Sequence, residues 1–86
     1  MNKQATIETI DRAATWIATH LDTDDTVIRV EVWAGTIRIL VPPDTFDRIA
    51  GNTEVKATRS DGFTHLSMDI DGVTIAAIVL PPGVGQ

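Results

Sequence analysis

The sequence predicts a single small α+β domain in which an antiparallel sheet carries the N-terminal helix on one face. Three observations predict this class. Apolar residues near the N-terminus recur at helical spacing, later segments alternate apolar and polar residues, and three dipeptides ending in glycine separate the alternating segments. The expected order is α-β-β-α-β-β-β, with residues 1–80 as the domain and residues 81–86 as a flexible C-terminal tail.

The first expected element is a helix from about Ala5 to Leu21. Its apolar residues are spaced by three and four, which places them on one seam that we expect the sheet to cover: Ile7, Ile10, Ala14, Ile17 and Leu21. At about 100° per residue, Trp16 lies roughly 140° from the centre of this seam. We therefore expect Trp16 to point away from the sheet.

Arg12 and His20 stand four residues before and four residues after Trp16, on the same side of the predicted helix. Tryptophan and arginine are enriched at binding hot spots, so Arg12, Trp16 and His20 form the first candidate surface for a partner. Alternatively, a loop or the short second helix covers Trp16, or Arg12 only stacks on its ring.

Two strands follow, Thr26 to Trp33 and Thr36 to Val41, joined by a turn at Ala34-Gly35. In this register Val30 faces Ile39 and Val32 faces Ile37. A tight turn requires a positive φ that alanine tolerates poorly, so a bulged or longer loop stays an alternative.

A short second helix is expected after Pro42-Pro43. Asp44 and Asp47 resemble an N-terminal capping arrangement, and Gly51 fits the position just after the helix. The buried side of this helix would be formed by Phe46, Ile49 and Ala50.

The remaining residues are predicted to form three strands, residues 53–59, 63–70 and 73–80. Tight turns at Asp61-Gly62 and Asp71-Gly72 join these strands. The last strand is apolar almost throughout, which favours a place inside the sheet or against another chain. Whether the two-stranded and three-stranded pieces join is left open. The expected core comprises Ile10, Ile17, Leu21, Val30, Val32, Ile37, Ile39, Val55, Leu66, Met68 and Ile75.

The outer face of the sheet is too apolar for simple exposure to water. In the predicted registers it carries large side chains that form the second candidate partner surface: Trp33, Phe63, Ile78 and Leu80. Leu40 and Ala76 point the same way. Either the sheet curls into a partial barrel, the short helix packs there, or another polypeptide covers this face.

The charged residues argue against several functions. A net charge of -5 opposes binding to nucleic-acid phosphates, and no apolar run approaches the length of a membrane span. The acidic stretches, Asp22 to Asp25 and Asp69 to Gly72, do not complete a calcium loop. His20 and His65 have no metal-ligand or acid/base spacing, so we expect no cofactor, no metal and no catalysis.

The cysteine-free, threonine-rich composition, with aspartate outnumbering glutamate, resembles that of small accessory proteins of actinobacterial phages and plasmids. This resemblance implies a cytoplasmic protein that binds and modulates a host protein. The sequence thus favours a non-enzymatic protein-binding module, as a homodimer or with another protein. One alternative is a ligand-binding or minor enzymatic domain with a pocket near Trp33, Phe63 and His65. In that case His65 and a carboxylate such as Asp69 would carry out acid/base chemistry. Another is an acidic mimic of DNA.

Overall fold

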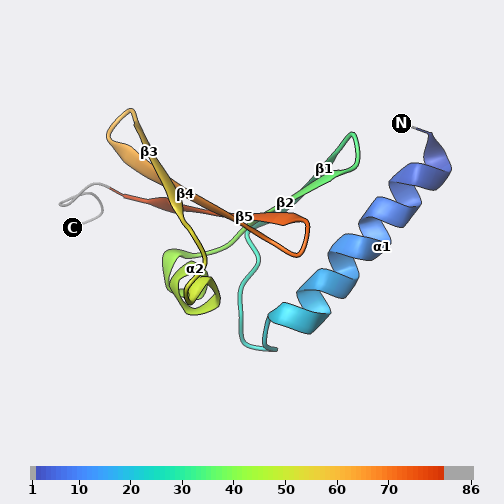
Figure 1. Cartoon of the computed structure of the whole chain (residues 1–86), viewed down its shortest axis with the longest axis horizontal. Coiled ribbons are helices and arrows are strands. Elements are labelled where there is room, and N and C mark those ends of the chain that lie inside the picture. Colours follow the sequence, from blue (N-terminus) through green and yellow to red (C-terminus); the bar gives the residue numbers. More distant parts are fainter. Residues whose placement is uncertain (1, 81–86) are drawn as a thin grey trace.

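The computed structural model describes residues 2–80, and it confirms the predicted α+β class and order of elements (Figure 1). A five-stranded sheet forms one layer and two helices form the other. The elements in chain order are α1 (Lys3–His20), β1 (Arg29–Trp33), β2 (Thr36–Leu40), α2 (Pro43–Ala50), β3 (Lys56–Ser60), β4 (Phe63–Ile70) and β5 (Val73–Val79). The predicted tail, residues 81–86, lies outside the described residues.

The sheet order is β1-β2-β5-β4-β3, so the last strand of the chain lies at the centre. This order joins the two predicted pieces, β1-β2 and β3-β4-β5, through one pair of strands. That pair, β2 with β5, is parallel, whereas the other three pairs are antiparallel as expected. The central position explains why β5 is apolar on both faces: Ile75, Ala76 and Ala77 are all buried.

All three predicted two-residue turns form, and the predicted registers are confirmed: Val30 pairs with Ile39, and Met68 pairs with Ile75. Ala34 adopts the positive φ of 48° that the tight turn requires, so the bulged alternative does not occur. Asp61 and Asp71 have the same backbone conformation in the other two turns.

The orientation of α1 differs from the prediction. The helix buries Thr9, Ala13 and Trp16, each one residue before a member of the expected seam, which corresponds to a rotation of roughly 100°. Trp16 is only 4% exposed, whereas Ile7 and Ile10 are 42% and 51% exposed. Tryptophan has the larger area to bury, so its burial takes precedence over that of the two isoleucines.

Both helices lie on the same face of the sheet (Figure 1). A single core contains Trp16 of α1, Phe46 of α2 and the inward side chains of β2, β4 and β5. The expected core residues Ile37, Ile39, Met68 and Ile75 are buried, and Ile17, Leu21 and Leu66 pack at its margin. Ile10, Val30 and Val55 were wrongly assigned to the core, because Ile10 turns sideways and the two valines lie near the edges of the sheet.

The predicted cap of α2 also requires correction. Pro42 is the N-cap of α2 and makes no side-chain capping bond, so Asp44 and Asp47 do not cap the helix, although Asp44 lies in its first turn. Gly51 follows the helix with positive φ, as expected.

No helix within residues 2–80 is both long enough and apolar enough to cross a membrane.

Candidate functional site

Trp16 and His20 attach α1 to the hairpin between β4 and β5. The indole Nε1–H of Trp16 donates a 3.0 Å hydrogen bond to the carbonyl oxygen of Ile70, and the ring of His20 stacks on the indole at 4.3 Å between centroids. His20 Nε2 lies 2.9 Å from Asp71 Oδ2, in the turn itself. Trp16 was expected to face away from the sheet, but these contacts bury it against its own chain.

Both ring nitrogens of His20 face oxygen acceptors. Nδ1 lies 3.0 Å from the carbonyl oxygen of Trp16, and Nε2 contacts Asp71. Neither nitrogen is directed into solvent, where a substrate or a metal ion would need it. Beside this cluster runs a shallow groove of about 380 Å³ whose lining includes Arg12, Trp16 and His20. The structure therefore brings the three residues of the first predicted surface together along this groove, but Trp16 is buried beneath it.

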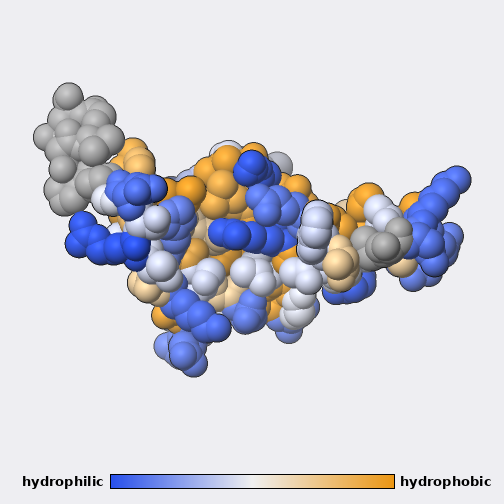
Figure 2. Space-filling model, turned by 90° about the horizontal axis from the view of Figure 1, so that it is seen from above, coloured by the Kyte–Doolittle hydropathy of each residue, from blue (hydrophilic) through white to orange (hydrophobic). Residues whose placement is uncertain are grey.

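The second predicted surface is divided between two ends of the sheet. Trp33 lies beside the β1-β2 turn and is 81% exposed. Phe63, Ile78 and Leu80 lie toward the opposite end, six to eight residues of strand away, or roughly 20–26 Å along the strands. We call the face of the sheet opposite the two helices the helix-free face. Figure 2 views the molecule from above, where hydrophobic residues reach the surface between charged ones.

This division removes the pocket proposed as an alternative. Trp33 and Phe63 cannot line one cavity from opposite ends of the sheet. His65 and Asp69 share a face of β4, but they are four residues apart, or about 13 Å. Asp69 Oδ1 instead accepts a 2.8 Å hydrogen bond from Thr74 Oγ1 on β5. The residues chosen for acid/base chemistry do not converge.

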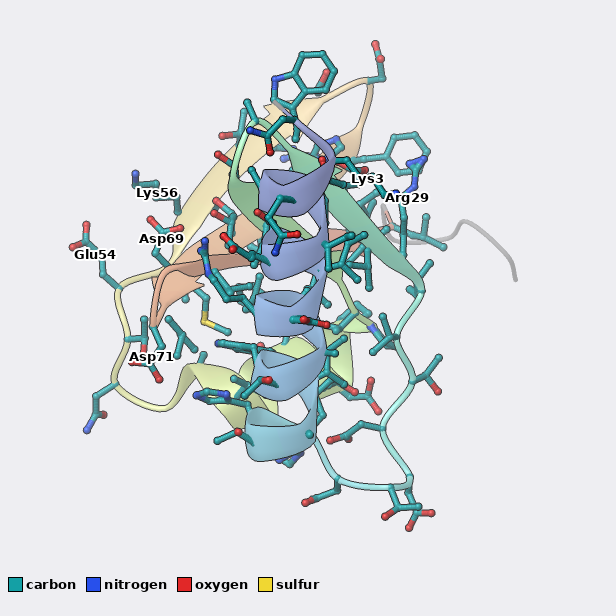
Figure 3. The ribbon with its side chains drawn as sticks, turned by 90° about the vertical axis from the view of Figure 1, so that its right-hand side faces the viewer. Lys3, Arg29, Glu54, Lys56, Asp69 and Asp71 are labelled. Atoms are coloured by element: carbon teal, nitrogen blue, oxygen red, sulfur yellow. The ribbon has the colours of Figure 1, made fainter. Side chains whose placement is uncertain are left out.

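A polar groove of about 490 Å³ lies on the side of β3 and β4. Its lining includes Glu54, Lys56, Ser67, Asp69 and Thr74. Figure 3 shows Glu54, Lys56 and Asp69 on one side of α1, with Lys3 and Arg29 on the other. No histidine lines this groove, and within residues 2–80 no three histidine or carboxylate side chains come together as metal ligands.

Several acidic residues have structural partners. Arg48 of α2 bonds to Asp25, and its Nη1 lies 3.8 Å from Asp22 Oδ2, in the loop after α1. Asp25 also accepts a 2.7 Å hydrogen bond from the backbone nitrogen of Asp22. Asp61 and Asp71 occupy turns. These acids hold loops and turns in place, which weakens the alternative of an acidic surface shaped like DNA.

A third surface was not expected from the sequence. Trp16 and His20 face the β4-β5 turn, and α1 also packs beside β1. Outside its buried side, α1 leaves apolar side chains exposed, as does the start of β1, and we name this surface the α1-β1 flank: Ile7, Ile10, Ala14, Ile28 and Val30. One sequence signal pointed to it: Trp16 and the isoleucine seam together span an apolar arc too wide for one sheet to cover.

No protein-family model, curated protein or solved structure shows significant similarity to the chain.

Proposed function

We propose that this chain is a non-enzymatic protein-binding module that contacts another polypeptide through β1 and the α1-β1 flank. The observation that carries the proposal is the combination of an edge strand with exposed apolar side chains on the helix beside it. Exposed apolar patches of this kind are typical of protein-protein contacts, and an edge strand adds unpaired backbone groups.

The two edges of the sheet support this choice. At the β3 edge all five residues are exposed and the side chains are polar or small: Lys56, Ala57, Thr58, Arg59 and Ser60. An edge strand of this composition can stay exposed to water without pairing with another chain. At the β1 edge, Val30 is 42% exposed on the face that carries α1, where Ile7 and Ile10 are exposed as well, and Trp33 is exposed on the opposite face. Only the β1 edge combines strand and helix into one apolar surface.

The arrangement of the titratable groups supports a non-enzymatic role. Both nitrogens of His20 are engaged by acceptors, and His65 is distant from Asp69 along β4. General acid/base catalysis needs groups that converge on one reacting atom. The predicted partner roles of Arg12, Trp16, His20, Trp33, Phe63, Ile78 and Leu80 stay predictions, as does the role of an accessory protein that modulates a host protein.

The proposal can be tested with two matched aspartate substitutions. Ile10 on the flank and Ile78 on the helix-free face are both partly exposed isoleucines, so each can be changed without opening the core. The wild-type chain and the variants Ile10→Asp and Ile78→Asp are crosslinked in host lysate and alone at high concentration. Every crosslinked polypeptide, including a second copy, is then identified by mass spectrometry.

We expect a specific crosslinked polypeptide with the wild type and with Ile78→Asp, and its loss with Ile10→Asp. Loss with Ile78→Asp alone would move the site to the helix-free face. A wild-type chain that crosslinks to no polypeptide, neither another protein nor itself, would overturn the proposed function.

A further inference from the structure

We propose that the polypeptide bound at the β1 edge is a second copy of this chain, paired antiparallel through β1 about a two-fold axis at Val30. This inference rests on the proposed function and names its partner. The two copies would form one continuous ten-stranded sheet, since each contributes five strands. Three features support it: the direction of the backbone groups, the charges on β1, and the position of the flank.

The backbone of β1 offers hydrogen-bonding groups at its outer edge. Trp33 and Thr36 flank a two-residue turn, and residues in this position form a hydrogen-bonded pair. Because backbone groups alternate in direction along a strand, those of Trp33, Glu31 and Arg29 point toward β2. The groups of Val30 and Val32 therefore point to the edge, where a second strand would pair with them, whereas the backbone N–H of Ile28 donates to the carbonyl oxygen of Leu40 in β2.

The charges on β1 favour the register with the axis at Val30 over the one with the axis at Glu31. With the two-fold axis at Val30, Arg29 of each copy lies opposite Glu31 of the other, and Val30 lies opposite its own copy. Moving the axis to Glu31 would place the two glutamates directly opposite each other, which is unfavourable. Arg29 Nη1 already lies 3.4 Å from Glu31 Oε1 within one chain. In the dimer, two such pairs would form a group of four alternating charges.

The flank lies where a symmetric contact needs it. Both copies of α1 would stand on the same face of the continuous sheet, because the two-fold axis that relates two antiparallel edge strands runs perpendicular to the sheet and keeps corresponding faces on one side. Because α1 packs beside β1 and leaves Ile7 and Ile10 exposed, these side chains of the two copies would lie near the two-fold axis. Isologous pairing of one apolar patch is the commonest way in which soluble chains associate. The sheet contact and the helix contact therefore share one axis.

The test uses charge exchange between the two positions. In the proposed register, Arg29→Glu places a new glutamate opposite Glu31 of the second copy, and Glu31→Arg places a new arginine opposite Arg29 of the second copy. Each single variant should self-associate roughly ten- to a hundredfold more weakly than the wild type, because two attractive pairs become repulsive. An equimolar mixture of the two variants should associate as tightly as the wild type, since every charge again faces its opposite.

Dissociation constants are measured by sedimentation at low ionic strength, with circular dichroism as the check that each variant is folded. Arg59→Glu on the β3 edge, which changes the net charge by the same amount as Arg29→Glu, is the matched control and should leave self-association unchanged. Native mass spectrometry of the mixture, with one variant carrying a mass tag, should show the mixed dimer in excess over both homodimers.

Three results would overturn the inference. If Arg29→Glu self-associates as tightly as the wild type, Arg29 does not face Glu31 and the register is wrong. If the mixture fails to recover, the contact is not this strand pair. If the wild type crosslinks only to a different protein, the proposed function stands and the second copy is excluded as its partner.

Discussion

The two sides of α1 both carry large apolar residues but differ in what covers them. On one side, Trp16 is buried, hydrogen-bonded to Ile70 and stacked on His20, which in turn contacts the β4-β5 turn. On the other side, Ile7 and Ile10 leave about half of their surface in water beside the edge strand β1. One helix thus combines a side that belongs to the core with a side that extends beyond it.

We expect the buried side of α1 to determine the stability of the domain and the exposed side to take part in binding. A buried residue with a specific hydrogen bond should govern unfolding, because its removal leaves a cavity and an unpaired carbonyl. A half-exposed isoleucine has little burial to lose within the monomer. Substitutions on the two sides of α1 should therefore affect stability and association separately.

The largest effect is expected from Trp16→Ala. Removing a buried tryptophan costs about 3–5 kcal/mol, a large share of the total stability of a small domain. The free energy of unfolding is measured by urea denaturation. Trp16→Phe is the informative control, since it retains most of the apolar area but loses the bond to Ile70. An unchanged midpoint for Trp16→Ala would mean that the buried side does not hold the helix on the sheet.

A smaller loss is expected from His20→Ala, about 1–2 kcal/mol, because the stacking on Trp16 disappears together with the contact to Asp71. Asp71→Asn should cost less than about 1 kcal/mol, since Asp71 is exposed and asparagine tolerates the same turn conformation. A double-mutant cycle over the two positions isolates their coupling. Strictly additive losses would show that the bond between α1 and the turn contributes nothing measurable.

The smallest effect on stability is expected from Ile10→Ser, below about 1 kcal/mol, because half of the side chain is already in water. The same variant should weaken association at the β1 edge. Thermal unfolding at low protein concentration measures the first quantity and sedimentation measures the second. A loss of stability as large as that of Trp16→Ala would contradict the separation of the two sides.

Local sequence signals were sufficient for the elements and for most of the strand pairing. The glycine at the second position of each turn, together with alternation in the flanking strands, predicted the three hairpins and their registers. The parallel pair of β2 and β5 has no comparable local signal, because residues about 36 positions apart in the chain form it. Only the apolar character of β5 indicated a central place.

The candidate site was harder to predict, because periodicity gives the sides of a helix but not the depth to which each is buried. The seam contains several apolar residues and the other side has only Trp16, so the number of apolar residues favoured the wrong side of α1 as the buried one. The deciding features were the area of the indole and the acceptor for its N–H, the carbonyl of Ile70 in β4. Neither is visible from α1 alone. The isoleucines of the flank are exposed because α1 buries Trp16 in their place.

The central position of the last strand has a consequence for how the domain is assembled. Until β5 has been synthesised, β1-β2 and β3-β4 are two separate hairpins, and isolated hairpins are marginally stable in water. Joining them requires closure of the long segment between β2 and β5, and such non-local pairing slows folding. During this interval the inner edges of both hairpins are unpaired and prone to aggregation. A chain truncated before Val73 should therefore accumulate as insoluble hairpins rather than as a smaller folded domain.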